Sequence, residues 1–176
     1  MPNSSWDEFA AALAPASGER ILDVGAGKGS VASRVLQVSK GAEVYAVDPD
    51  VKKVEAIRTS FPAIKSSVAG AESLPFPDAF FDKAYTTMAL HHFNDLDRAL
   101  GEIARVLRPG GFFVVLEVEP GSAKGVTFRI FGRIMGEHMN LMTEEQLSSR
   151  LAAAKRFKVA RSTKFGSSYL IQLLRV

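Results

Sequence analysis

The sequence contains no cysteine, which excludes disulfide bonds, thiolate metal sites and a cysteine nucleophile. It also lacks a run of about 18 apolar residues, the length that spans a membrane. The formal net charge is only +3, and lysine and arginine form no long block, so charge does not indicate a nucleic-acid partner. The first residues lack the apolar core of a secretion signal. We therefore expect a cytoplasmic protein without a transmembrane segment.

The 176 residues, 47% of them hydrophobic, suit one globular domain spanning 1–176. Short β-branched segments alternate with segments whose apolar residues recur every three or four positions. The predicted strands are 20–24, 43–47, 64–68, 80–88 and 112–118, and the predicted helices are 5–13, 29–38, 51–61 and 96–107. This alternation indicates an α/β fold with a mostly parallel sheet, covered by helices on both faces.

The C-terminal part departs from this alternation. A helix is predicted over 143–154, with Thr143 as its N-cap and Gln146 at the capping-box position. Two strands follow at 157–163 and 168–175, joined by a few residues around Gly166. A connection this short requires antiparallel pairing, because parallel strands need a crossover of a dozen or more residues.

A strand, a glycine-rich turn and a helix follow one another in ILDVGAGKG, residues 21–29. Gly25 and Gly27 allow a tight turn and close approach of the backbone to a ligand. The helix that follows offers free N–H groups and the positive end of its dipole to an anionic group. Asp48 ends the next predicted strand, where a carboxylate accepts hydrogen bonds from ribose hydroxyls. Together these features predict an adenosine-like ligand at the carboxyl edge of the sheet.

Two classes of protein bind such a ligand in this way. Dinucleotide-binding enzymes usually carry G-x-G-x-x-G, whereas this turn reads G-x-G-x-G, and no tyrosine has a lysine four residues later. An NAD(P)-dependent oxidoreductase is therefore the alternative interpretation.

Five segments together resemble the class I S-adenosylmethionine-dependent methyltransferases, in particular the branch with the ubiquinone and menaquinone biosynthesis enzymes. They are ILDVGAGKG (21–29), AVDPD (46–50), AGAESLPFPDAFFD (69–82), MALHHF (88–93) and ARVLRPGG (104–111). The resemblance runs from about residue 20 to residue 118 and keeps the family's order. It implies a methyltransferase with S-adenosylmethionine as cofactor and S-adenosylhomocysteine as product. A non-catalytic protein that binds S-adenosylmethionine as a scaffold is a further alternative.

The resemblance also implies a Rossmann-like three-layer sandwich, with a seven-stranded sheet and an antiparallel C-terminal strand. The implied cofactor contacts are Asp23 near the ammonium group, Gly25, Ala26 and Gly27 at the methionyl end, Asp48 and Pro49 at the ribose, Ala71 and Glu72 at the adenine, and Thr87 and Met88 at the sulfonium. The family often has an acid before the Ala-Glu pair, where this chain has Gly70. Either Glu72 or a backbone carbonyl then accepts the hydrogen bond from the adenine amino group, or the adenine is bound less specifically.

His92 and Glu117 are the candidate catalytic residues, because both follow strands at the edge where the methyl group should lie. A base is needed only for an acceptor that carries a proton. The alternative roles are structural: local hydrogen bonds for His91, a solvated acid pair for Glu117 and Glu119, and a surface position for His138. No group of these residues has metal-ligand spacing.

Residues 125–142 are a candidate cap over the acceptor site. Apolar residues at helical spacing are Phe128, Phe131, Met135 and Met139, and Arg129 with Arg133 forms a basic pair. Such a wall suits an apolar or aromatic small-molecule acceptor, although a core-packing helix, a dimer interface or a membrane-surface contact would show the same pattern. Because little chain precedes the first strand, we expect an open pocket that a large acceptor or the second subunit of a homodimer closes.

Overall fold

The computed structural model describes residues 3–135, 139–153 and 155–176. Its helices are α1 (Asn3–Leu13), α2 (Ser30–Val38), α3 (Val51–Ser60), α4 (Leu96–Val106), α5 (Ala123–Met135) and α6 (Glu144–Ala153), with a short 3-10 helix η1 (Leu90–His92). Its strands are β1 (Arg20–Val24), β2 (Glu43–Asp48), β3 (Lys65–Val68), β4 (Phe81–Thr87), β5 (Leu107–Val118), β6 (Phe157–Phe165) and β7 (Ser168–Arg175). The predicted α/β alternation is confirmed.

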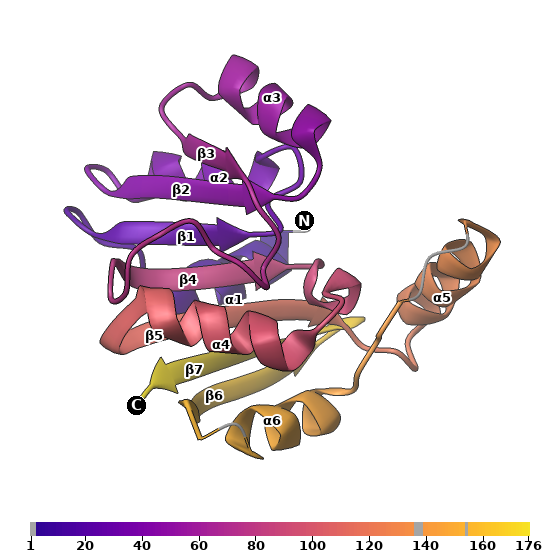
Figure 1. The fold of residues 1–176 in the computed structure, drawn as a ribbon. Coiled ribbons are helices and arrows are strands. Elements are labelled where there is room, and N and C mark those ends of the chain that lie inside the picture. Colours follow the sequence, from indigo (N-terminus) through magenta and orange to yellow (C-terminus); the bar gives the residue numbers. More distant parts are fainter. Residues whose placement is uncertain (1–2, 136–138, 154) are drawn as a thin grey trace.

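The strands form one seven-stranded sheet in the order β3-β2-β1-β4-β5-β7-β6 (Figure 1). β1 to β5 pair in parallel, whereas β7 runs antiparallel to both β5 and β6. The predicted C-terminal hairpin and the Rossmann-like fold class are thus confirmed. Because Ser168 pairs with Val118, the β6–β7 turn lies at the carboxyl edge of the parallel strands.

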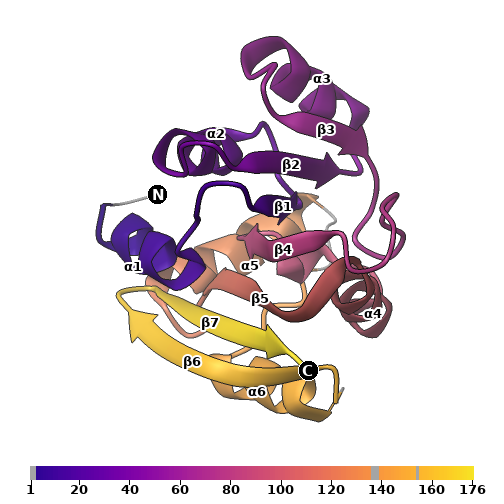
Figure 2. The ribbon, with the colours of Figure 1, turned by 90° about the vertical axis from the view of Figure 1, so that its left-hand side faces the viewer.

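Helices cover both faces of the sheet, which gives the three predicted layers (Figure 2). α1 and α2 pack on one face around Phe9 and Tyr85, whose rings meet edge to face at 5.2 Å. α4 and α6 pack on the other face, where Leu100 and Leu147 join Phe113 of β5. The core therefore lies on both sides of the sheet and leaves its carboxyl edge accessible.

Local hydrogen bonds explain where α6 begins. The Thr143 hydroxyl accepts the N–H of Gln146 at 3.2 Å, and the Gln146 side chain accepts the N–H of Thr143 at 2.9 Å. This is the reciprocal capping box predicted from the sequence.

The start of β5 differs from the prediction. The strand begins at Leu107, and the Pro-Gly-Gly segment lies inside it as an irregularity opposite Asp82. A side chain at Gly111 would place its Cβ 2.7 Å from the Asp82 carbonyl oxygen. The glycine therefore lets the two backbones pass closely, and the strand continues through what the sequence suggested was a turn.

α5 stands apart from the sheet, beyond the carboxyl ends of the parallel strands (Figure 1). α5 overlaps in sequence with the first part of the predicted 125–142 cap, whereas His138 lies outside the described residues. In the described part of the chain, no helix has the length and apolar character needed to cross a membrane. Within the same residues, no three histidine, aspartate or glutamate side chains are grouped to hold a metal ion.

Candidate functional site

A cavity of about 830 Å³ opens at the carboxyl edge of the sheet, within the usual range of small-molecule sites. Nine of the ten residues predicted to bind the cofactor line it: Gly25, Ala26, Gly27, Asp48, Pro49, Ala71, Glu72, Thr87 and Met88. His92 lines it as well, whereas Asp23 and Glu117 do not.

The glycine-rich turn is held by the neighbouring strand. The N–H groups of Gly25 and Ala26 both donate to the Val47 carbonyl oxygen, at 2.9 and 3.0 Å. Gly25 has a φ of 79°, and a Cβ there would lie 2.6 Å from the Ala89 Cβ. Glycine is therefore required both by the backbone conformation and by the close approach of the segment after β4.

The N-terminus of α2 faces the cavity without a side-chain cap. Gly29 occupies the N-cap position in the left-handed region and makes no side-chain hydrogen bond. Ser30 and Val31, in the first turn of the helix, line the cavity. Free N–H groups and the positive end of the helix dipole make this a place for a carboxylate.

Asp48 is buried at the end of β2 and is fixed from two sides. Its Oδ2 accepts the Gly27 N–H at 2.9 Å, and its Oδ1 accepts the Asp50 N–H at 3.0 Å. Lys53 Nζ lies 3.6 Å from Oδ1. Because each carboxylate oxygen accepts more than one hydrogen bond, Asp48 remains able to accept from two ribose hydroxyls.

Asp23 is buried beneath the turn, in register with Tyr85 of the neighbouring strand. Neither carboxylate oxygen has a hydrogen-bond partner among the described residues. Burial raises the pKa of Asp23 to about 8, against the opposing effect of the nearby Tyr85 hydroxyl. A buried carboxylate that lacks a partner fits an ammonium group of a ligand, but it lies behind the cavity wall and not in it.

Glu72 bridges two loops at the far end of the cavity. Its Oε1 accepts the N–H groups of Asn94 at 2.8 Å and Asp95 at 3.3 Å. A Cβ added at Gly70 would lie 3.0 Å from Glu72 Oε2. The second oxygen of Glu72 therefore occupies the space beside Gly70, where the family often carries an acid.

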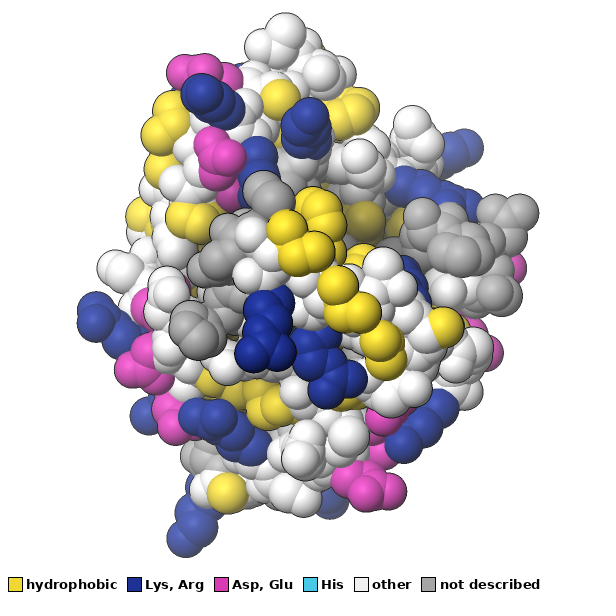
Figure 3. Space-filling view, turned by 90° about the vertical axis from the view of Figure 1, so that its right-hand side faces the viewer, with side chains coloured by type: hydrophobic (Ala, Val, Ile, Leu, Met, Phe, Trp, Pro, Cys, Tyr) yellow, Lys and Arg dark blue, Asp and Glu magenta, His cyan; other side chains and the backbone are white. Residues whose placement is uncertain are grey.

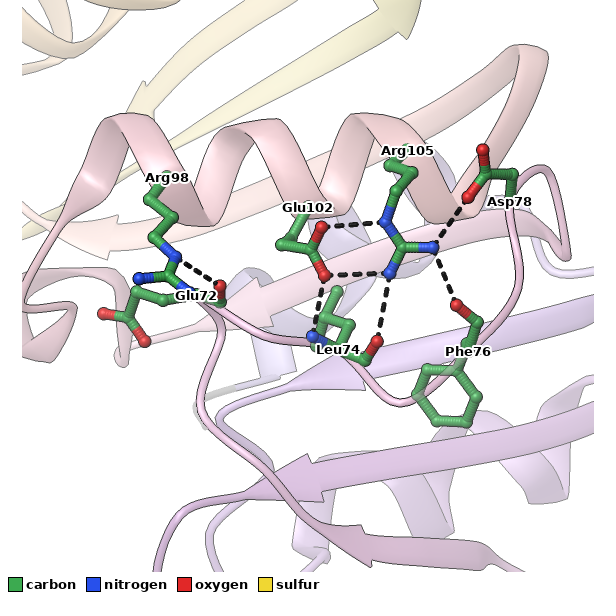
Figure 4. A network of polar contacts seen from close by, with 7 residues as sticks. All are labelled: Glu72, Leu74, Phe76, Asp78, Arg98, Glu102 and Arg105. Atoms are coloured by element: carbon green, nitrogen blue, oxygen red, sulfur yellow. Dashed lines mark hydrogen bonds and ion pairs between the residues drawn. The ribbon is translucent and has the colours of Figure 1, made fainter.

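The loop that carries Ala71 and Glu72 is fastened to α4 by a network of polar contacts (Figure 4). The Arg105 guanidinium donates to the carbonyl oxygens of Leu74 at 3.0 Å and Phe76 at 2.8 Å. Glu102 accepts from Arg105 at 2.8 Å and from the Leu74 N–H at 2.9 Å. The hydrogen bond from Arg105 lowers the pKa of Glu102.

We expect Arg105→Met to loosen this loop. Loss of the guanidinium leaves the carbonyl oxygens of Leu74 and Phe76 without their donor. The free energy of unfolding should fall by about 1–3 kcal/mol, and affinity for S-adenosylhomocysteine should fall several-fold. Thermal denaturation and calorimetric titration measure the two effects. The control is Arg58→Met, which removes a single hydrogen bond from Arg58 of α3 to the Ser66 carbonyl oxygen of β3; an equal loss of affinity in both variants would contradict the assigned role.

The end of β4 forms another wall of the cavity. Met88 has a φ of 53°, a conformation that non-glycine residues rarely adopt. Its N–H donates to the Leu116 carbonyl oxygen at 2.8 Å, which holds the chain in this conformation. Strained backbone of this kind often occurs at ligand sites, and Thr87 and Met88 both line the cavity.

The two histidines after β4 have different surroundings. His91 is buried, and its Nδ1 lies 2.8 Å from Glu117 Oε2. Glu117 Oε1 also accepts the Leu90 N–H at 2.8 Å. Glu117 is therefore a buried anchor for η1 and not part of the cavity wall, unlike its predicted position. The Glu119 carboxylate lies 3.9 Å from Lys164 Nζ of β6.

Several lining residues come from elements that sequence reasoning did not connect with the site. Lys124 lies in α5, next to the predicted 125–142 cap, but Ser5 comes from α1, and Gly166, Ser167 and Ser168 come from the β6–β7 turn. The predicted hairpin could have placed the last three residues at the site. A strand antiparallel to β5 must start at the carboxyl edge, so its preceding turn lies beside the cavity.

Residues 22–115, more than half of the chain, match the family model described as a methyltransferase domain. The chain belongs to the S-adenosylmethionine-dependent methyltransferases. The hydride-transfer alternative is correspondingly not favoured.

Two curated relatives and one solved structure illustrate this methyltransferase similarity. An uncharacterized methyltransferase of Mycobacterium bovis is 39% identical over 99 residues, covering 56% of this chain and 40% of the relative. The demethylmenaquinone methyltransferase of Thermus thermophilus is 36% identical over 119 residues, covering 64% of this chain and 54% of the relative. The chain thus spans about half the length of these relatives. An S-adenosylmethionine-dependent methyltransferase structure from Mesorhizobium loti superposes with a TM-score of 0.83 at 21% identity, covering 98% of each chain, and shows the shared fold.

Proposed function

We propose that this chain transfers the methyl group of S-adenosylmethionine to a small acceptor with an apolar or aromatic body. The observation that carries the proposal is the cavity at the carboxyl edge, whose wall contains nine of the ten residues predicted to bind that cofactor. The family match supports the same activity.

The cavity offers complementary groups for each part of the cofactor. The uncapped N-terminus of α2 would bind the carboxylate of the methionyl end, and Asp23 would attract its ammonium group from behind the turn. Asp48, oriented by the Gly27 N–H, would accept the two ribose hydroxyls. Glu72 Oε2, beside Gly70, would accept from the adenine amino group in place of the acid that this chain lacks.

S-adenosylmethionine, when bound, supplies a methyl group that is already activated, because the sulfonium leaving group departs neutral. The residues around it then need to orient the acceptor and exclude water. His92 would remove a proton if the acceptor carries one, since it is among the residues that line the cavity. Glu117 would position His92 indirectly, because it holds Leu90 and His91 in the same turn of η1.

Apolar side chains support an apolar acceptor. Met88, Phe93 and Phe165 line the cavity together with Ala89, and such walls suit a flat or irregular hydrocarbon body. The similarity to a demethylmenaquinone methyltransferase favours a quinone-like ring among the candidates. α5, which forms part of the predicted 125–142 cap, would border the acceptor side, because its Lys124 reaches the cavity wall.

Ligand-dependent stabilisation tests cofactor choice. S-adenosylhomocysteine should raise the melting temperature, whereas NAD should leave it unchanged. At a ligand concentration of about 100 times its Kd, S-adenosylhomocysteine should add about 2.7 kcal/mol to the free energy of unfolding. Stabilisation by NAD alone would contradict the proposal.

Turnover then separates an enzyme from a scaffold. Release of S-adenosylhomocysteine should be measured over a panel of reduced quinones, phenols and amines. Acceptor-dependent release with a reduced quinone or phenol is the expected result. Cofactor binding without turnover on any of the three classes would favour the non-catalytic alternative.

A further inference from the structure

One face of α5 exposes an unusual amount of apolar surface. Val126, Ile130 and Ile134 are 41, 57 and 76% exposed, and Phe131 is 59% exposed. The first three recur every four residues and so form one line along the helix. Elsewhere in the described chain, large exposed hydrophobic side chains are valines scattered over separate elements.

Basic side chains flank this apolar face on both sides. On a helical projection, Arg129 and Arg133 border the line of Val126 and Ile130, and Lys124 borders Phe131 on the opposite side. The sequence of α5 contains no acidic residue. Figure 3 looks onto this edge of the molecule and shows hydrophobic side chains beside lysine and arginine side chains near its middle. An apolar face with cationic borders is typical of helices that lie on anionic membranes.

The opposite side of α5 carries small or partly buried residues, and its start is tied to the preceding loop. Ser122 caps the helix by accepting the Gly125 N–H on its hydroxyl at 3.0 Å. Gly125 is buried, and a Cβ there would clash with the backbone of Glu119 and Pro120. Gly132, two turns later, is buried on the same side. Phe128, on the side of the helix away from Ile130, lies with its ring 6.2 Å from the His91 ring, so the side that carries Gly125 and Phe128 faces the protein and the isoleucines face outward.

A second copy of the chain fits this face poorly. Two copies of α5 packed together would bring cations against cations, because the helix carries no acidic residue to pair with them. A helix of 13 residues is about 20 Å long, and one face of it offers far less than the roughly 800 Å² per partner of a stable interface. An anionic lipid surface, in contrast, satisfies the basic borders and the apolar line together.

We infer that α5 docks on anionic membrane surfaces, with Val126, Ile130, Phe131 and Ile134 entering the headgroup boundary while arginines contact lipid phosphates. The inference goes beyond the proposed methyl transfer and does not depend on it. Lys124 belongs both to α5 and to the cavity wall, so docking would bring the cavity mouth to the lipid surface. An apolar acceptor dissolved in the bilayer would then reach the site without crossing water.

Vesicle flotation tests the inference with the complete chain. The protein should float with phosphatidylcholine vesicles that contain phosphatidylglycerol and much less with phosphatidylcholine alone, and added salt should weaken the binding. The double variant I130S/I134S should reduce binding at least tenfold. R129Q/R133Q should reduce it by roughly 25-fold, about fivefold for each charge.

Matched variants outside α5 control for general loss of hydrophobicity or charge. V38S/V176S removes two other exposed valines, and Lys158→Gln removes an exposed charge on β6; both should bind vesicles like the parent chain. Unchanged melting temperature and stabilisation by S-adenosylhomocysteine verify that each variant is folded and keeps its cofactor site. Absence of binding to the anionic vesicles at low salt would overturn the inference, as would equal losses in the controls. A concentration-dependent dimer that I130S/I134S abolishes would instead identify the face as a self-interface.

Discussion

Replacing Asp48 with alanine should weaken the binding of S-adenosylhomocysteine by roughly 100-fold or more. The carboxylate would accept two charge-assisted hydrogen bonds from the ribose, each contributing about 1.5–3 kcal/mol. Its removal also releases the Gly27 N–H, which Asp48 Oδ2 holds at 2.9 Å, so the glycine-rich turn loses a constraint. Calorimetric titration measures the change in affinity directly.

Two further variants serve as a control and as a comparison for Asp48→Ala. Asp50→Ala removes a nearby acid that caps α3 through the Lys52 N–H, and it should lower stability by about 1 kcal/mol with little effect on affinity. Glu72→Ala should weaken binding by about tenfold, because only one oxygen of Glu72 is available to the adenine while the other accepts backbone N–H groups. If Glu72→Ala proved more damaging than Asp48→Ala, the ribose and adenine roles would be misassigned.

Replacing Asp23 with asparagine should raise the melting temperature of the ligand-free protein at pH 8. Burial raises the pKa of Asp23 from 3.8 to about 8, so between these values the folded state binds a proton that the unfolded state releases. The contribution of Asp23 to stability is therefore fully favourable below pH 4 and is lost progressively as the pH rises toward 8. The asparagine side chain does not titrate and avoids this loss.

At pH 8 the free energy of unfolding of Asp23→Asn should exceed that of the parent by an amount on the order of a few kcal/mol. An amide group left without a hydrogen-bond partner would reduce this difference by about 1–3 kcal/mol. For a chain of this size the difference corresponds to roughly 5 °C. Thermal denaturation at pH 5 and pH 8 should show that the difference between variant and parent grows with pH. Asp7→Asn, on an exposed position of α1, is the matched control. Parallel pH profiles for Asp23→Asn and the parent would contradict the prediction.

The same substitution should weaken the binding of S-adenosylhomocysteine, because the amide carries no negative charge for the ligand ammonium. A variant that is more stable yet binds less well is the pattern expected of a residue kept for function. Loss of stability together with unchanged binding would instead indicate a packing role for Asp23.

The fold was predictable because each element carries a local signal. Alternating strand and helix patterns gave the parallel part of the sheet, and the short link around Gly166 required the antiparallel hairpin. The cofactor side was predictable for a similar reason: the turn at Gly25 and the acid at Asp48 belong to consecutive strand ends, which a parallel sheet places at one edge.

The parts that were not predictable depend on packing between distant segments. Phe131 was expected to line the acceptor side, but it is exposed, whereas Phe128 of the same helix is the residue that lies near His91 of η1. Glu117 was expected at the cavity, yet its side chain shares the face of the sheet that carries Phe113 and Tyr169. There it meets His91 beneath η1. Neither outcome follows from spacing along the chain.

The cavity wall joins Ser5, near the start of the chain, with Ser168, near its end. Bringing together residues so far apart in sequence costs more chain entropy than closing a local turn. The binding site is therefore complete only when the β6–β7 hairpin has paired with β5. A nascent or partly folded chain would possess the glycine-rich turn but not the finished pocket.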